Sequence, residues 1–179
     1  LLYQAQATAG VALDQPLSLV ALSQPGVLLD APLSRLAFAF LLIGYATKAG
    51  LAPMHTWLPD AHSQAPAPVS GLLSGALLSC AFYVLLRHIA ILRPSLPPEL
   101  PETALLALGI LSLAVAVPFL LLQHDLKRLL AYSSVEHVGI LAIGAGVGAV
   151  GGAVLTGGGA LGTVGGAAVG GVIGHEVSK

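Results

Sequence analysis

The sequence has very little charge. Only 8% of its 179 residues are Asp, Glu, Lys or Arg, whereas an ordinary globular domain has about 25%. Seven basic and eight acidic residues leave a formal net charge of -1, so the basic surface of a nucleic-acid-binding protein is absent. Hydrophobic residues make up 56% of the chain. This composition excludes a nucleic-acid partner and predicts an integral membrane protein that is embedded in a lipid bilayer.

Cysteine and the common catalytic motifs are also scarce. The one cysteine, Cys80, excludes an internal disulfide; although it follows Leu-Leu-Ser as in a lipoprotein processing site, we expect a packed core thiol. Phosphate-binding loops, flavin or nicotinamide signatures and catalytic triads are missing, and the histidine spacing does not fit a metal cluster. We therefore expect no catalytic residue, cofactor or metal site. The sequence begins at Leu1 without a basic region, which we interpret as a truncated N-terminus and not a signal peptide.

Long uncharged runs predict the membrane helices. Residues 1–32 mix short apolar pieces with prolines, which is typical of a helix end and a loop. Beyond them, apolar stretches approach the length that crosses about 30 Å of hydrocarbon at 1.5 Å per residue. The predicted spans are Leu33–Leu51, Val69–Leu86, Thr103–Gln123 and a fourth that begins near Leu129. The fold class expected from this pattern is an all-α integral membrane helix bundle.

A proline-rich segment interrupts this pattern after the first span. Pro53 removes a backbone donor, so it should break the helix and free carbonyl groups beside Lys48, the lone charge at the end of the run. A charge costs roughly 2.5–3.5 kcal/mol at membrane depth on insertion scales. Residues 53–68 contain no Lys or Arg. Two interpretations stand: a discontinuous helix that lines a polar cavity, or an interfacial loop with Trp57 at the headgroups.

Charges reappear in two connections and in the fourth helix. The proline-rich stretch from Arg93 to Glu102 predicts a rigid exposed connection, and residues 124–128 predict a solvated turn. The basic residues do not decide the membrane orientation. Glu136 and His137 point about 100° apart on the fourth helix, so at least one of them should face a protein interior or an aqueous path.

The C-terminal part is rich in glycine. Fifteen of the twenty-two glycines lie between Gly139 and Gly174. Many of them are four residues apart, which places them on one helix face and permits close packing of helices. This spacing predicts a self-associating glycine-zipper hairpin over residues 143–179. Its packing positions are Gly144, Gly148, Gly152, Gly158, Gly162, Gly166, Gly170 and Gly174.

Residues of about 33–139 resemble a known family. The stretches Gly44–Asp60, Ala61–Gly75 and Asp125–Gly139 are similar to the antiporter-like, proton-translocating membrane subunits of respiratory complex I, sodium/proton antiporters and membrane-bound hydrogenases, in particular hydrogenase-4 component F. The resemblance implies that residues 33–142 are a fragment of such a domain, with about four membrane helices. It also implies a multi-pass, non-redox subunit of a hydrogenase-4 or NADH dehydrogenase-like oxidoreductase complex, with other membrane and redox subunits as partners in the bacterial inner membrane.

The resemblance also assigns residue roles. It implies that Lys48 is the proton-path lysine of the broken helix, and Glu136 is then its substitute carboxylate partner. His137 and His55 are candidates for relaying protons, although an ordinary hydrogen-bonded side chain is the alternative for each histidine. A lysine that snorkels to the interface is the alternative for Lys48. Many relatives have a Lys or His where Ser79 stands, and a serine at that position cannot titrate.

The glycine-rich tail resembles a different family. Residues 143–179 are similar to the glycine-zipper domain of the osmotically inducible lipoprotein B, and the two resemblances meet near Gly139–Gly146. Three functional hypotheses follow. The chain is a fragment of a proton-translocating subunit, a glycine-zipper protein of the cell envelope that maintains membrane integrity, or a non-functional chimera of the two families.

Overall fold

The described part of the chain is entirely helical. The computed structural model describes residues 2–4, 22, 29–97 and 99–155, with only the backbone for 150–155, and this part contains no strand. The predicted all-α class is confirmed. The elements in chain order are α3 (Ala31–Ala49), α4 (Trp57–Gln64), α5 (Ala67–Leu72), the π-helix η1 (Leu73–Leu77), α6 (Leu78–Leu92), the 3₁₀-helix η2 (Arg93–Ser95), α7 (Glu99–Leu122) and α8 (Leu126–Leu155).

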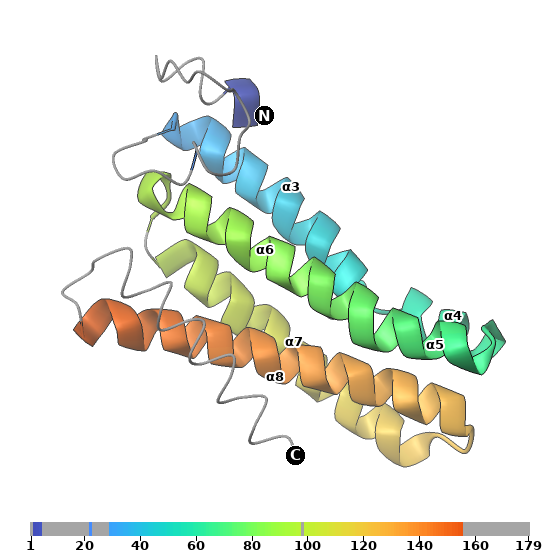
Figure 1. Cartoon of the computed structure of the whole chain (residues 1–179). Coiled ribbons are helices and arrows are strands. Elements are labelled where there is room, and N and C mark those ends of the chain that lie inside the picture. Colours follow the sequence, from blue (N-terminus) through green and yellow to red (C-terminus); the bar gives the residue numbers. More distant parts are fainter. Residues whose placement is uncertain (1, 5–21, 23–28, 98, 156–179) are drawn as a thin grey trace.

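The helices form two packed pairs (Figure 1). Helix α3 lies beside α6, and α7 lies beside α8. The short helix α4 contacts the first part of α8 and joins the two pairs at one end of the bundle. A mainly apolar core of leucine, alanine and phenylalanine side chains fills the space between the elements. The discontinuous helix α3–α4 therefore spans both pairs and fixes their relative position at that end.

Three of the described helical stretches are long and apolar enough to cross a membrane. They are Ala67–Ser95, Glu99–Leu122 and Leu126–Ala149. Helix α3 corresponds to the first expected span, but it is not among the three because Arg35 and Lys48 lower its apolarity. The second span also extends well past Arg87, where the sequence had suggested its end. The structure thus supports a multi-pass membrane protein.

Two local expectations are wrong. The segment that follows Arg93 is not an exposed connection, because α7 already begins at Glu99 and the Arg93 guanidinium forms an ion pair with the Glu102 carboxylate. Both side chains are 10% exposed, so the pair is buried between the end of α6 and the start of α7. Cys80 was expected in the core, but it is exposed on α6. Its small side chain points away from the buried face that includes Leu78 and Leu85.

Helix α8 continues through the boundary expected at residues 142–143. Gly144 and Gly148 are half-buried on this helix. The backbone of Gly152 is helical, and the expected zipper positions from Gly158 to Gly174 lie outside the described residues.

The close approach of α7 and α8 uses other glycines. A Cβ atom on Gly109 of α7 would lie 2.8 Å from the carbonyl oxygen of Gly139, and one on Gly146 would lie 3.2 Å from the carbonyl oxygen of Glu102. Ala142 and Ala149 continue this buried face of α8. The contact therefore repeats at positions 139, 142, 146 and 149, the three-and-four spacing of packed helices, and the four-residue glycine series lies beside it.

Candidate functional site

The break in the discontinuous helix is closed by a glycine cap. Helix α3 ends at Ala49, and Gly50 adopts a left-handed conformation with φ 77°. The Leu51 N–H donates to the Ala46 carbonyl at 2.9 Å, and the Gly50 N–H donates to Thr47 at 3.2 Å. This pair of bonds is a Schellman motif, which satisfies carbonyls at the end of a helix. Pro53 lies in the turn that follows, so the helix stops one turn before the proline.

Two side chains from distant positions hold the turn in place. The Trp57 indole donates from Nε1 to the Thr47 carbonyl at 2.8 Å. The Ala52 N–H donates to the Ser112 hydroxyl of α7 at 2.9 Å, and this hydroxyl donates in turn to the Leu108 carbonyl at 2.7 Å. Ser112 is fully buried. The break is therefore a satisfied and packed structure, and Trp57 acts in it as a hydrogen-bond donor.

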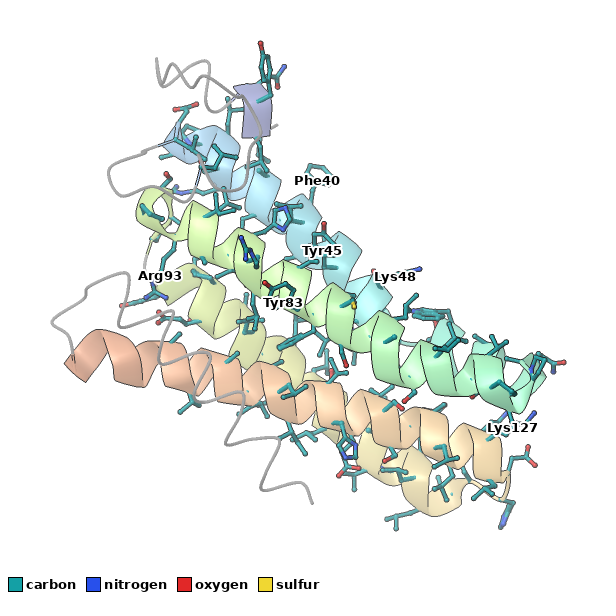
Figure 2. All side chains as sticks on the ribbon, in the orientation of Figure 1. Phe40, Tyr45, Lys48, Tyr83, Arg93 and Lys127 are labelled. Atoms are coloured by element: carbon teal, nitrogen blue, oxygen red, sulfur yellow. The ribbon has the colours of Figure 1, made fainter. Side chains whose placement is uncertain are left out.

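Lys48 lies at the last turn of α3, and its side chain is exposed. In Figure 2 it points away from α6. It borders a shallow apolar hollow with Phe40, Leu41, Gly44 and Tyr45. A cation at a helix C-terminus is stabilised by the helix dipole. Among the described residues, the ion pairs join Arg93 to Glu102 and Arg128 to Asp60, so the structure does not bring Lys48 and the half-buried Glu136 together as an ion pair.

A groove lies between the α5–η1–α6 helix and α8; most of its surface is apolar, and we call it the polar groove because hydroxyl, imidazole and ammonium groups also line it. Its cavity volume is about 650 Å³. Lys127 lies at the end of the bundle near α4 (Figure 2), where its Nζ donates to the Ala65 carbonyl at 3.1 Å. Apolar side chains, among them Phe82 and Leu141, line the groove farther along the helices. The polar residues that line it are His62, Ser70, Ser74, Ser79, Lys127, Ser133, Ser134 and His137.

Hydrogen bonds connect several of these polar groups. His62 Nδ1 lies 2.5 Å from the Ser70 hydroxyl, and the Ser74 hydroxyl lies 2.8 Å from that of Ser134 on α8. Ser74 belongs to the π-helix η1, where the Leu78 N–H reaches the Leu73 carbonyl five residues earlier. Such π-helical turns occur frequently at functional sites. The groove thus contains hydroxyl groups, each of which can both donate and accept a hydrogen bond.

Two buried histidines near the break favour their neutral forms. Both lie outside the three candidate spans. His62 is 2% exposed, and burial lowers its pKa below the ordinary value; its Nε2 has no partner in the described part of the chain. Burial also lowers the pKa of His55, while the Pro53 backbone raises it by a smaller amount. The His55 ring lies 6.3 Å from that of Tyr132 on α8, measured between centroids.

The sequence-predicted residues fall in separate places. His137 lines the groove and its Nδ1 lies 2.6 Å from the Ser133 carbonyl, whereas Lys48 lies on the outer face of α3. His55 is buried near Tyr132, outside the residues that line the groove. Sequence reasoning missed the polar roles of Ser70, Ser74, Ser112 and Ser134. A series of serines in apolar helices was the available signal, because buried hydroxyls require partners.

Together these features define a class of protein. The chain is a multi-pass helical membrane protein with a discontinuous helix, a polar groove beside that helix and a dry helix pair behind it.

Comparison with known proteins identifies the family within this class. The model of the NADH:quinone oxidoreductase/Mrp antiporter transmembrane family matches residues 9–157, and the chain belongs to this family. The match continues beyond both ends of residues 33–142, the range expected from the sequence.

Curated relatives agree with this membership. A hydrogenase-4 component F homolog of Methylacidiphilum infernorum (isolate V4) is 46% identical over 117 residues, which are 65% of this chain and 24% of the relative. NAD(P)H-quinone oxidoreductase chain 4 of Synechococcus sp. (strain CC9605) is 42% identical over 111 residues, 62% of this chain and 21% of the relative. The chain of the same description from Prochlorococcus marinus (strain MIT 9303) is 42% identical over 62% of this chain and 20% of the relative. The chain thus matches about a quarter or less of the length of each relative.

Proposed function

We propose that this chain forms part of a proton-translocating membrane subunit in a hydrogenase-4 or complex I-like assembly. Support comes from its membership of the transmembrane antiporter family and from relatives described as hydrogenase-4 component F and quinone oxidoreductase chain 4. The proposed location is the bacterial inner membrane, where other membrane subunits and redox subunits are its partners. Redox chemistry takes place in those other subunits and supplies the energy for proton movement.

The observation that carries this proposal is the polar groove along α8. His62 and Ser70 form one hydrogen-bonded contact, and Ser74 and Ser134 form another. A groove of this volume holds several water molecules, since each occupies about 30 Å³ in the liquid. Water in the groove would connect these two contacts, and His62 adds an imidazole ring whose Nε2 has no partner among the described residues. His137 and Glu136 extend the proposed path along α8, and His55 extends it at the break.

Lys48 is the proposed charge-changing site. Burial or loss of a carboxylate neighbour lowers the pKa of a lysine, and approach of a carboxylate raises it. A lysine that meets a carboxylate in one state and loses it in another therefore takes up and releases a proton. Glu136 serves this purpose only after a rearrangement, since the two residues are not an ion pair in the described structure.

Proton flux into liposomes tests the role of Lys48. Purified protein is reconstituted with a pH-sensitive dye inside, and a potassium gradient with valinomycin supplies the driving voltage. We expect Lys48→Ala to abolish the protein-dependent flux. Arg35→Ala is the matched control, because it removes a cation from the same helix at its other end. Equal flux in the wild type and Lys48→Ala would contradict the proposed role.

A further inference from the structure

The polar groove is open along one side. Gly71 and Gly75 on one wall and Leu130 on the other line the groove and are exposed. A Cβ atom on either glycine would have nothing within 4 Å. On α8 the lining residues run from Lys127 to Leu141, a length of about 21 Å at 1.5 Å per residue. The groove is therefore a long channel with a lateral opening.

The Lys127 end of the groove lies at a membrane surface. Lys127 is the second residue of α8 and marks one end of the bundle (Figure 2). The turn at residues 123–125 connects the candidate spans Glu99–Leu122 and Leu126–Ala149, and a turn between consecutive spans lies outside the hydrocarbon region. One leaflet with its headgroups is about 20–22 Å thick. The groove thus extends from the headgroup region across about one leaflet.

This end of the groove favours an anionic group. Among the described residues that line the groove, Lys127 carries a full positive charge and none is an Asp or Glu. Lys127 Nζ donates to the Ala65 carbonyl, but an ammonium group has three donors. The neighbouring Arg128 is already paired with Asp60 at 3.5 Å. An anion that binds Lys127 therefore meets no carboxylate from the described lining of the groove.

His62 supplies a second polar group at the same end. It lies three residues before Ala65, the residue that Lys127 binds. The ring lines the groove and is 2% exposed, and its Nδ1 contacts the Ser70 hydroxyl while Nε2 has no partner in the described part of the chain. Buried polar atoms nearly always have a hydrogen-bond partner. When Ser70 donates to Nδ1, Nε2 carries a proton and can donate it in a hydrogen bond to an oxygen of a bound group.

The rest of the groove suits a hydrocarbon chain. Leu78, Phe82 and Leu141 line its inner part, where His137 already contacts the Ser133 carbonyl. A volume of about 650 Å³ over about 21 Å gives a mean cross-section of about 30 Å². A helix 10–12 Å in diameter has a cross-section of about 80–110 Å². The groove thus admits a chain, or side chains of a helix that packs over it, but not a whole helix.

We propose that the polar groove binds an anionic phospholipid of the surrounding leaflet, with the phosphate at Lys127 and His62 and one acyl chain along the apolar part. The inference rests on insertion in a membrane and does not require proton transfer. The bound chain covers the open side of the groove, while the half-buried Ser74 and Ser134 stay paired with each other. The lipid thereby becomes part of the wall that separates these hydroxyls from the bilayer.

Photoactivatable lipids test this proposal. Purified protein is placed in nanodiscs that contain a trace of phosphatidylglycerol or phosphatidylcholine with a diazirine in one acyl chain, and adducts are mapped by mass spectrometry. The exposed Leu121 and Leu122 of α7 report general lipid contact. Relative to them, we expect groove adducts to be about fivefold more frequent with phosphatidylglycerol, the ratio for one lysine near anionic lipid. Lys127→Gln should abolish this preference.

Two leucine substitutions test whether the chain lies in the groove. Gly75→Leu fills its open space, whereas Ala76→Leu adds the same side chain at the next residue, which is exposed and is not among the described lining residues. We expect Gly75→Leu to remove the groove adducts and Ala76→Leu to retain them. If Gly75→Leu does not fold, Lys127→Gln still decides the result, because its side chain is exposed.

Several outcomes would overturn the proposal. Equal groove adducts with both lipids, or an unchanged preference in Lys127→Gln, would exclude binding of the anionic headgroup. Displacement by inorganic phosphate would indicate a site for a free anion. In native membranes, labelling of Leu121 without labelling of the groove would show that a protein helix covers it. Liposome flux is scored separately, so a failed proton path leaves this result unchanged.

Discussion

The two sides of α8 differ in how closely they pack against their neighbours. On the side that faces α7, packing is so close that a Cβ atom on Gly146 would lie 2.8 Å from Leu106 Cγ and one on Gly139 would lie 3.0 Å from Ser112 Cβ. On the side that faces η1, the same helix presents Ser134 and His137 to a groove of about 650 Å³. One helix thus forms a dry, tightly packed contact and borders a polar space. The dry contact holds α8 in position, which fixes the geometry of the polar side.

A matched pair of glycine substitutions should show the largest difference between the two sides. A Cβ atom on Gly109 would lie 2.7 Å from Ile143 Cγ1 and 2.8 Å from the Gly139 carbonyl oxygen, whereas Gly75 has nothing within 4 Å. We expect Gly109→Ala to destabilise the protein by about 1–3 kcal/mol through overpacking. Gly75→Ala should leave the stability equal or slightly higher, because alanine favours helix. Thermal unfolding in detergent measures both, and equal losses would contradict the contrast.

Loss of the Ser112 hydroxyl, which joins the helix break to α7, should have the next largest effect on stability. Ser112→Ala leaves the Ala52 N–H buried without a partner, which typically costs about 1–3 kcal/mol. Ser79→Ala is the control, since Ser79 is exposed toward the groove. Denaturation in a urea series compares the free energies of unfolding of the two variants. A Ser112→Ala variant as stable as Ser79→Ala would show that the break does not depend on this bond.

Acid should destabilise the protein through His62. Burial lowers its folded-state pKa below the ordinary value of 6.5, so the unfolded chain binds a proton first as the pH falls. Stability is therefore retained above about pH 6.5 and decreases as the pH falls from there through the folded-state pKa. Melting temperatures of the wild type and His62→Gln from pH 7.5 to pH 5 measure this dependence. A decline that is as steep in His62→Gln would assign it to other groups.

The smallest expected effect is the coupling between Ser74 and Ser134. Their hydroxyls are 2.8 Å apart across the groove, and hydrogen bonds between membrane helices contribute about 0.6 kcal/mol on average in double-mutant cycles. Single alanine variants and the double variant give this coupling from thermal unfolding. A coupling free energy of zero would indicate that water already replaces the direct contact between the two hydroxyls. The groove side of α8 would then be held even less tightly than the side that faces α7.

The difference between these regions also explains how far the sequence predicts the structure. Apolar run lengths were sufficient for the helical class. The stretch from Lys48 to Pro53 predicted that the helix breaks, but it left a discontinuous helix and an interfacial loop as alternatives. The end of α3 was harder to place, since Gly50 closes it through a left-handed conformation that local prolines do not specify. The four-residue glycine spacing indicated close packing on α8. It did not identify Gly139 and Gly146, which depend on the position of α7.

The polar groups were the least predictable. A serine in an apolar helix is compatible with lipid, a groove or a buried bond, and only tertiary contacts distinguish the exposed Ser79 from the buried Ser112. The π-helix that contains Ser74 has no clear signature in the sequence. Arg87 resembled the end of a span, but the helix continues past it because Ile89, Ile91 and Leu92 pack into the core. Long-range packing thus determines both which serines line the groove and the exposed position of Arg87 on α6.

The measurement that most directly tests proton movement through the groove is liposome flux in a histidine pair. His62 lines the groove and contacts Ser70 at 2.5 Å, whereas His88 lies beside Tyr45 with ring centroids 5.4 Å apart, away from the groove-lining residues. We expect His62→Leu to remove most of the protein-dependent proton flux and His88→Leu to retain it, at equal amounts of reconstituted protein. Unchanged flux in His62→Leu would contradict the account.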